Sequence, residues 1–324
     1  MVKDSAASPP RGDEAKHVTE NAVIDRAEVK FDKVSVVIVN KNERLLSDTL
    51  DSLKSSVGRI LDEVLVVDAS SGALDDIRLS HEWARWIDYV QPPGLRITIA
   101  HQRNIGVREA KGDIVVFTDS GCLPEDGWLE RLLAPILFEG ETVSCGPARA
   151  IGRSVYSGAH SSAKVVDVDY VPMAATINLA FRREAFDAIG GFDESFGSAE
   201  DIDFTWRLND CGYRIRWVQD AVVGHDYGTP MRQLRRSFFY GKGECRLLRK
   251  HNNRIAEAAT QNSVPIVYAL FLVGLPLTLK WRWYPLLLLW PVWRLRNEEV
   301  QWLVLLDHIV MGAGVLHELV RPGT

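Results

Sequence analysis

Two adjacent acids, Glu200 and Asp201, begin a segment whose apolar residues recur at helical spacing. Three apolar residues share the predicted helical face: Ile202, Trp206 and Leu208. Ser198 with Asp201 forms a loose variant of the Ser-x-x-Glu signal that starts helices, and Gly212 marks the end of the segment. The pattern therefore predicts a helix with two carboxylates in its first turn.

The position of Asp201 predicts chemistry as well as structure. The positive end of a helix dipole favours the ionised form of a carboxylate in the first turn. An ionised carboxylate held in this way suits removal of a proton from an alcohol. The alternative is that Glu200 and Asp201 only stabilise a helix start, so the choice depends on the rest of the chain.

Composition limits the class of protein. The chain has 324 residues, of which 46% are hydrophobic and 25% charged, as in globular proteins with one large or two smaller domains. A net charge of −5, with no basic patch interleaved with aromatics in the first 230 residues, argues against nucleic-acid binding. The four cysteines are widely spaced, without a Cys-x-x-Cys pair, which favours a reduced, cytosolic protein.

The first 29 residues differ from the rest. They are polar and of mixed charge, include Pro9-Pro10, and contain no apolar run. Acidic Asp4, Asp13 and Glu14 further argue against a secretory signal peptide. We expect residues 1–29 to form a disordered tail.

From Val34 onward, short β-branched runs alternate with amphipathic segments. The expected strands are Val34–Val39, Val64–Val67, Ile97–Ile99 and Ile114–Phe117. The expected helices are Glu43–Ser56 and Arg103–Ala110, and the stretch Ala73–Pro93 carries no clear pattern. Such alternation predicts an α/β fold with a mainly parallel sheet flanked by helices.

Ligands of parallel sheets sit beyond the carboxyl ends of the strands, and Asp68 and Asp119 both follow predicted strands there. The first strand runs into Asn40-Lys41-Asn42-Glu43 without the Gly-x-Gly-x-x-Gly motif of dinucleotide-dependent dehydrogenases. The chain also lacks a Walker A sequence. The sequence therefore gives no support to a dinucleotide-dependent dehydrogenase.

Residues 251–324 form an apolar region, predicted to be helical. Its apolar segments are Val264–Leu279, Trp283–Trp293 and Val300–Leu316, and none is a clean span of about 20 residues. Half of the tryptophans and four basic residues are interspersed here: Trp281, Trp283, Trp290, Trp293, Trp302, Lys280, Arg282, Arg294 and Arg296. Tryptophan beside Lys or Arg favours a membrane interface. The alternative is a helical subdomain packed on the core.

Five ordered motifs together resemble family 2 glycosyltransferases with the GT-A fold. They are VSVVIVNKNE (34–43), VVDASSG (66–72), Arg103-Asn104 before DIVVFTDSGCLP (113–124), NLAFRREAFDAIGGF (178–192) and Glu200-Asp201. The resemblance covers roughly residues 34–245 and implies a GT-A domain over residues 30–250. It also implies an inverting transferase of the hexosyltransferase type.

The resemblance assigns residues to the nucleotide-sugar donor. It places Asp68 on the base or ribose, with Asn40 and Glu43 in the same pocket, although a lone Asp after a strand is also a common turn residue. The remaining donor-side residues by the same resemblance are Arg103, Asn104, Asp119, Asn178, Arg182, Arg183 and Arg236.

The family usually holds Mg²⁺ or Mn²⁺ with an Asp-x-Asp motif and a downstream histidine. Here the motif reads Asp119-Ser120-Gly121, so its second acid is missing, while His225 matches the histidine. Asp119 and His225 remain the candidate ligands, with water in the vacant position. Alternatively, Arg232, Arg235 or Arg236 stabilises the leaving diphosphate.

The resemblance makes Asp201 the catalytic base and leaves Glu200 to orient Asp201 or the acceptor. Gln233-Leu234-Arg235-Arg236-Ser237 is similar to the Gln-x-x-Arg-Trp motif of processive synthases, but Ser237 replaces the tryptophan. The sequence thus predicts transfer of one sugar to a lipid-linked or cell-envelope glycan at the cytoplasmic face of the membrane. Two alternatives are an inactive nucleotide-sugar-binding or scaffold protein of the same fold, and a nucleotidyltransferase, which would need a basic glycine loop after the first strand.

Overall fold

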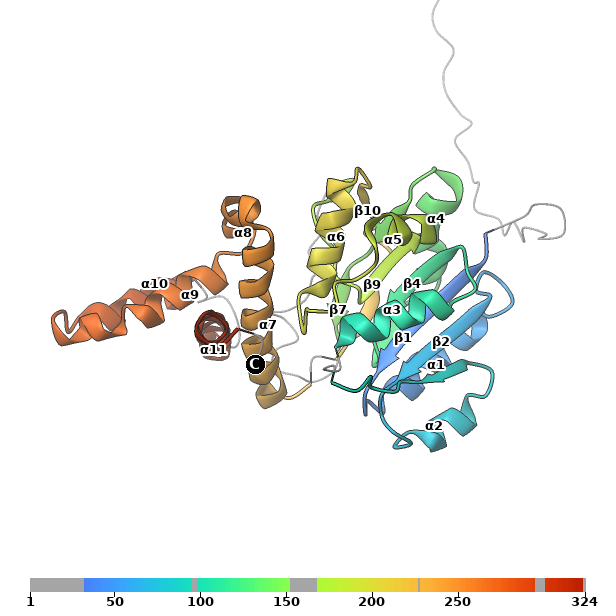
Figure 1. Ribbon diagram of the computed structural model, residues 1–324, viewed down its shortest axis with the longest axis horizontal. Coiled ribbons are helices and arrows are strands. Elements are labelled where there is room, and N and C mark those ends of the chain that lie inside the picture. The colour runs from blue at the N-terminus through green and yellow to red at the C-terminus, as the bar shows by residue number, and fades with distance from the viewer. Residues whose placement is uncertain (1–31, 95–97, 152–167, 227, 295–300, 323–324) are drawn as a thin grey trace, which may run out of the picture. The chain divides into compact units, whose positions relative to one another are not determined.

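The computed structural model describes residues 32–94, 98–151, 168–226, 228–294 and 301–322 (Figure 1). The predicted tail over residues 1–29 lies outside these described residues. Residues 32–324 cluster as one unit, so the predicted boundary at residue 250 separates two parts of that unit. That boundary coincides with the end of the long helix α7, Pro230–Lys250.

An eight-stranded sheet with the order β3-β2-β1-β4-β9-β6-β10-β8 forms the centre of the molecule. Its first four strands are parallel to one another, whereas β9 is antiparallel to both β4 and β6. The strands are β1 Val34–Asn40, β2 Glu63–Asp68, β3 Arg85–Asp88, β4 Ile114–Thr118, β6 Val143–Cys145, β8 Tyr170–Val171, β9 Asn178–Arg182 and β10 Ile215–Trp217. The predicted mixed, mainly parallel sheet is confirmed.

A second sheet has three short strands, with β11 between β5 and β7. Its strands are β5 Cys122–Pro124, β7 Ala148–Ala150 and β11 Val223–His225. The antiparallel pairing of β5 with β11 places Cys122 opposite His225. Two segments that are a hundred residues apart therefore meet next to Asp119.

Helices surround the central sheet. In the sheet domain they are α1 Leu46–Leu53, α2 Asp75–Ser80, α3 Ile99–Glu109, α4 Trp128–Phe138, α5 Arg183–Ile189 and α6 Glu200–Asp210, with the short 3₁₀ helix η1 Lys54–Ser56. After α7 come η2 Asn252–Arg254, α8 Ile255–Gln261, α9 Val264–Val273, η3 Leu275–Leu279, η4 Tyr284–Leu288, α10 Leu289–Arg294 and α11 Gln301–Val320.

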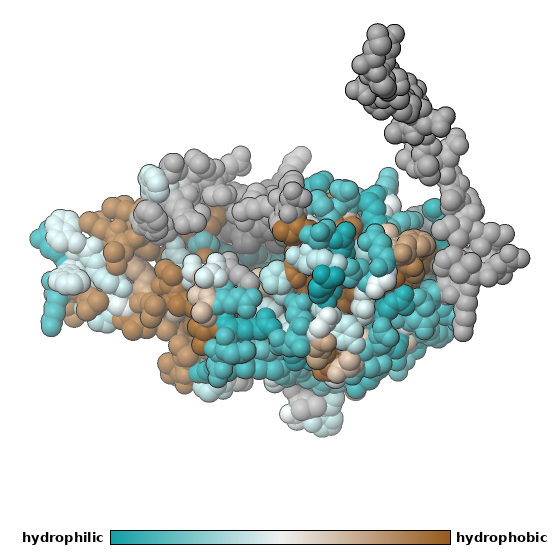
Figure 2. Space-filling model, turned by 90° about the horizontal axis from the view of Figure 1, so that it is seen from above, coloured by the Kyte–Doolittle hydropathy of each residue, from teal (hydrophilic) through white to brown (hydrophobic). Residues whose placement is uncertain are grey.

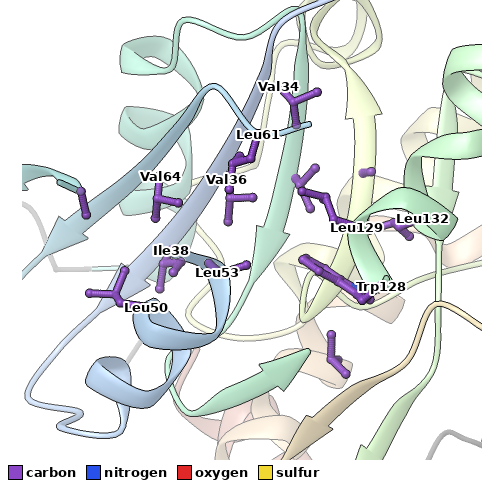
Figure 3. Packing of buried hydrophobic residues seen from close by; sticks show 14 of the residues in the cluster. Val34, Val36, Ile38, Leu50, Leu53, Leu61, Val64, Trp128, Leu129 and Leu132 are labelled. Atoms are coloured by element: carbon purple, nitrogen blue, oxygen red, sulfur yellow. The ribbon is translucent and has the colours of Figure 1, made fainter. Parts of the chain in front are cut away.

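The buried strand β1 shows why this sheet needs helices on both faces. All seven of its residues are buried, because side chains alternate between the faces and each face is covered. Val36 and Ile38 pack in one cluster with Leu50 of α1, whereas Val37 belongs to the cluster on the opposite face. Figure 3 shows the first cluster, in which Trp128 of α4 packs near the β1 side chains. The core thus fixes the carboxyl ends of β1 and β4.

The expected strand at Ile97–Ile99 is wrong for residues 98 and 99. Residue 97 lies outside the described residues. Ile99 begins α3, and the Thr98 hydroxyl caps that helix by accepting the backbone N–H of His101 at 3.1 Å. The third strand is Arg85–Asp88, which lies within the stretch Ala73–Pro93 that carries no clear pattern. A cap at Thr98 outweighs the β preference of two isoleucines, because it satisfies a backbone N–H that the helix start leaves unpaired.

The C-terminal helices pack on α7, which stands between them and the sheet domain (Figure 1). Close approach of α7 to α11 depends on glycine, since a Cβ at Gly241 would lie 2.0 Å from the Met311 carbonyl oxygen. Two buried acids of α11 also face α7. Asp307 accepts a hydrogen bond from Ser237, and Glu318 binds Arg246 at 2.7 Å.

Candidate active site

A cleft of about 460 Å³ opens at the carboxyl ends of β1 and β4, between the start of α6 and the first half of α7. This is the edge at which parallel sheets bind ligands. Its lining includes most of the predicted site residues: Asn40, Glu43, Arg103, Asp119, Glu200, Asp201, His225 and Arg236. Five distant segments of the chain, 40–43, 103, 119, 200–201 and 225–236, therefore place these polar side chains around one space.

The start of α6 differs from the predicted cap. Its N-cap is Ala199, in the left-handed region at φ 64°, and Ser198 makes no capping contact. Instead the Ser198 hydroxyl donates to the Phe239 carbonyl of α7 at 2.7 Å. The two helices meet closely there, because a Cβ at Gly243 would lie 2.4 Å from the Ser198 Oγ. The predicted capping role of Ser198 is wrong, and Ser198 joins α6 to α7.

Asp201 lies in the first turn of α6, as predicted, but its pKa is shifted in the direction opposite to the one expected. One carboxylate oxygen accepts the backbone N–H of Ile202 at 2.9 Å. Burial nevertheless raises the pKa of Asp201 above its ordinary value, and the negative charge of Asp119 adds to the rise, whereas Arg103 opposes it. The expectation of a lowered pKa is wrong, because desolvation outweighs the helix dipole. A raised pKa makes Asp201 a stronger base.

Glu200 and Arg103 form a buried ion pair beneath the cleft. Their side chains are 5% and 3% exposed, and Arg103 also reaches Asp119 at 3.4 Å. Burial raises the pKa of Glu200 to about 7, against the opposing charge of Arg103, and the neighbouring charge of Asp201 adds to the rise. This part of the cleft therefore holds more carboxylates than the single guanidinium neutralises.

Asp119 and His225 both face the cleft, from the ends of β4 and β11. Burial lowers the pKa of His225, and Arg236 contributes in the same direction although Asp119 opposes both. A neutral imidazole is the form that binds metal ions. The His225 Nδ1 lies 3.6 Å from the Cys122 sulfur.

The ligand set for a metal ion is small. Within the part of the chain that the structure describes, no group of three His, Cys, Asp or Glu side chains forms a metal site. Gly121, in place of a second acid, has φ 87° and donates its N–H to Thr49. Mg²⁺ sites often use one or two carboxylates and complete the shell with phosphates and water. In the cleft, Asp119 is the carboxylate available for such a site, and His225 adds a neutral nitrogen donor.

The first half of α7 supplies the positive charge of the cleft. Arg232, Arg236 and Tyr240 all line it, at the i, i+4, i+8 spacing of one helical face. Arg232 forms an ion pair with Glu43, which lies in the loop after β1. Tyr240 was not predicted, although its spacing from the two arginines is the signal that identifies it.

Three predicted donor residues do not line the cleft. Asp68 is buried and accepts hydrogen bonds from Asn40 at 3.1 Å and from Ser70. Asn104 binds the backbone of Phe192 in both directions at 2.9 Å. Asn178 donates to the Pro147 and Ala221 carbonyls, at 3.0 and 2.7 Å, so Asn104 and Asn178 join distant segments.

The predicted arginines outside the cleft have contacts of other kinds. Arg183 donates to the backbone carbonyls of Val107, Ala110 and Gly112, which fixes the turn between α3 and β4. Arg182 forms an ion pair with Asp32 at 2.6 Å. Arg235 is exposed on α7 and does not line the cleft.

The proteins that resemble this chain in sequence are glycosyltransferases. The sequence profile of the family described as Glycosyl transferase family 2 matches residues 35–240. The pre-mycofactocin glycosyltransferase of Mycobacterium tuberculosis is 33% identical over 193 residues, which cover 54% of this chain and 40% of that protein. The polypeptide N-acetylgalactosaminyltransferase 8 of Drosophila melanogaster is 27% identical over 70% of this chain and 44% of its own length. The chain thus spans less than half the length of both relatives.

Solved structures show a similar fold. The mannosyltransferase PcManGT from Pyrobaculum calidifontis, in complex with GDP-Man and Mn²⁺, superposes with a TM-score of 0.61. That similarity covers 90% of this chain and 88% of the mannosyltransferase at 19% identity. GalNAc-T7 with UDP, GalNAc and Mn²⁺ gives a TM-score of 0.51 over 72% of this chain and 58% of its own, also at 19% identity.

Proposed function

The chain belongs to glycosyl transferase family 2 and has the GT-A fold, and on this premise we propose that it transfers one sugar from a nucleotide-diphosphate sugar to an acceptor hydroxyl, with inversion. The observation that carries the proposal is that two kinds of charged group line one cleft. Carboxylates at the start of α6 and arginines of α7 both contribute to its lining. The carboxylates are suited to accept a proton from an alcohol nucleophile, and the arginines are suited to stabilise a departing diphosphate.

In the proposed reaction Asp201 is the general base. It takes the proton of the acceptor hydroxyl as the hydroxyl oxygen bonds to the anomeric carbon, while the bond from that carbon to the diphosphate breaks. Direct displacement inverts the configuration and needs a single base on the side opposite the leaving group. The raised pKa of Asp201 favours proton transfer at neutral pH, since the efficiency of a general base increases with its pKa as long as it stays ionised.

The donor side of the cleft carries Arg232 and Arg236, which would bind the diphosphate by charge-assisted hydrogen bonds. Asp119 and His225 would hold a divalent metal, which when bound offsets negative charge on the diphosphate. Glu43, which pairs with Arg232, would compete with the diphosphate for this guanidinium.

A panel of nucleotide sugars tests the assignment. We expect release of nucleoside diphosphate from one or a few donors, faster when an acceptor extract is present. Release of pyrophosphate would instead indicate a nucleotidyltransferase. Binding of nucleotide sugars without turnover across the panel would indicate an inactive protein of the same fold.

We further propose that the C-terminal region associates with the membrane, as a peripheral or monotopic protein at the cytoplasmic face, and that the acceptor is a lipid-linked or cell-envelope glycan. Figure 2 shows hydrophobic surface gathered at the end of the molecule formed by α9 and α10. The exposed large apolar side chains there are Leu270, Val273, Leu275, Leu277, Leu279, Trp281, Trp283, Leu286, Leu287, Leu289 and Trp293. Exposed Lys280 and Arg282 lie in the turn between η3 and η4, suited to anionic headgroups.

Helix α11 is the one described helix long and apolar enough to span a bilayer, over Trp302–Val320. The sequence did not predict such a span. However, α11 presents the buried acids Asp307 and Glu318 to α7, where they bind Ser237 and Arg246. Because those contacts hold α11 against the rest of the protein, we assign it to the packed part of the membrane-associated region.

Vesicle sedimentation tests this association. Full-length protein should sediment with vesicles containing phosphatidylglycerol, and the pair Trp281→Glu with Trp283→Glu should weaken binding at least about tenfold, since each buried indole contributes at about 25 cal/mol per Å². Leu79→Glu, at a residue that is 69% exposed on α2, is the matched control. Wild-type protein that stays in the supernatant with these vesicles would contradict the assignment.

A further inference from the structure

Arg103 lines the cleft, but its side chain is almost fully buried by contacts within the protein. Its side chain is 3% exposed, pairs with Glu200, and lies 3.4 Å from Asp119. The guanidinium carbon is 5.8 Å from the centre of the Phe117 ring and 5.9 Å from that of Phe192. Two carboxylates and two aromatic rings therefore fix the guanidinium from several sides.

The acid pair of α6 is asymmetric because of this contact. Glu200 is 5% exposed and its carboxylate is turned to Arg103, whereas Asp201 is partly exposed to the cleft. Adjacent residues at a helix start project in different directions, so holding one side chain fixes the rotation of the first turn. Ala199, in the left-handed region just before the pair, has no side-chain hydrogen bond that could cap the helix and fix this rotation instead.

We propose that Arg103 is a positioning residue: by binding Glu200 it fixes the first turn of α6 so that Asp201 is the carboxylate directed at the acceptor, and it makes no essential contact with the donor. This inference rests on the proposed function and names a part of the same site. It reassigns Arg103 from the donor-binding role that the sequence indicated.

Steady-state kinetics of nucleoside diphosphate release test the role. Arg103→Met should lower kcat by about a hundredfold, while the donor KM and the nucleoside diphosphate affinity change less than about threefold. Arg103→Lys keeps the charge and should recover about tenfold of the loss. Arg108→Met, at an exposed residue of the same helix that pairs with Glu194, is the matched control and should stay within about twofold.

A double-mutant cycle separates this role from a general loss of structure. Glu200→Gln should lower kcat about tenfold, and Arg103→Met combined with Glu200→Gln should lose no more than Arg103→Met alone, because the arginine acts through Glu200. Rates are expressed per nucleotide-binding site, so that unfolded protein does not count. The double variant also removes the unpaired buried charge, which keeps the test open where Arg103→Met alone fails to fold.

The outcomes distinguish this inference from the function on which it rests. A rise in donor KM or a loss of nucleotide affinity matching the loss in kcat would make Arg103 a donor ligand. Additive losses, about a thousandfold in the double variant, would overturn the link through Glu200. Wild-type protein that releases no nucleoside diphosphate from any donor contradicts the proposed function before any variant is compared.

Discussion

Acids at two helix junctions in the described part of this protein are neutralised differently. At the start of α6, Glu200 and Asp201 share the guanidinium of Arg103. In α11, the buried Glu318 contacts both Arg246, at 2.7 Å, and Lys242, at 3.9 Å. Two acids thus share one basic group at the first junction, whereas Glu318 pairs with two basic groups at the second.

The difference separates reactive from structural charge. An acid that lacks a full countercharge resists ionisation when buried, as the raised pKa values of Glu200 and Asp201 show, and this costs stability. A raised pKa also makes a carboxylate a stronger base for an alcohol. Glu318, held by cations of α7, instead keeps α11 in contact with the helix that lines the cleft. We therefore expect the proposed catalysis at α6 to depend on the second junction indirectly, through α7.

The largest effect expected in this comparison is at Asp201. Asp201→Asn keeps the size and polarity of the side chain but removes the base, so turnover should fall by about 10²-fold or more. Binding of nucleoside diphosphate should hardly change, which calorimetric titration checks. Asp210→Asn, at the exposed end of the same helix, is the matched control. Near-normal turnover of Asp201→Asn would remove the central assignment.

Glu318→Gln tests the paired junction. It leaves Arg246 and Lys242 without a buried countercharge, so the free energy of unfolding should fall by about 2 kcal/mol. Glu200→Gln should cost less than this at pH 8, because its carboxylate is already unfavourable when ionised. Urea unfolding measures both, with the exposed Glu257→Gln as a surface control. Equal losses at the two junctions would contradict the distinction between them.

Metal removal tests the donor side of the same cleft. If Asp119 and His225 hold Mg²⁺ or Mn²⁺, excess EDTA should abolish transfer, and His225→Ala should raise the metal concentration for half-maximal activity about tenfold, or about 1.4 kcal/mol. Titration of activity with Mn²⁺ after chelation measures this. Full activity in EDTA would show that Arg232 and Arg236 suffice for diphosphate departure.

Local patterns predicted much of the fold. The run Val34–Val39 and the spacing of Leu46, Leu50 and Leu53 identified β1 and α1, because an apolar run or a helical spacing can be recognised within one segment. The start of α3 was wrong, since three residues of β-forming type hid a cap at Thr98. Short strands such as Arg85–Asp88, which is only half-buried, carry no periodicity to detect.

The residues predicted at the end of a strand or at the start of a helix, Asp119, Asp201 and His225, do line one cleft. The prediction failed where the contacts of a side chain depend on distant partners. Asn178 is a polar residue beside a strand, but its contact with the Ala221 carbonyl, 43 residues away, cannot be inferred from its own segment. The same limit applies to the pKa of Asp201, because a helix dipole is local whereas burial is tertiary.

The smallest expected effect concerns Glu244 of α7, near the acid pair. It is half-buried beside Ile202, Trp206 and Leu247, around a small cavity of about 80 Å³. Burial raises the pKa of Glu244 to about 7, and the charge of Asp201 adds to the rise. Glu244 therefore belongs to the group of acids that lack a countercharge, although it does not line the cleft.

A folded-state pKa near 7, above the ordinary value of 4.5, means that the folded protein binds more protons than the unfolded chain between these two pH values. The free energy of unfolding then falls as pH rises through this window, and the loss is complete above pH 7. Glu244→Gln removes this dependence. We expect it to leave stability unchanged near pH 4.5 and to increase it by about 1 kcal/mol at pH 8, after allowance for partial exposure. Thermal unfolding of the variant and wild type across this range measures the difference, and a constant difference at all pH values would mean that Glu244 is neutralised by its surroundings and belongs with Glu318.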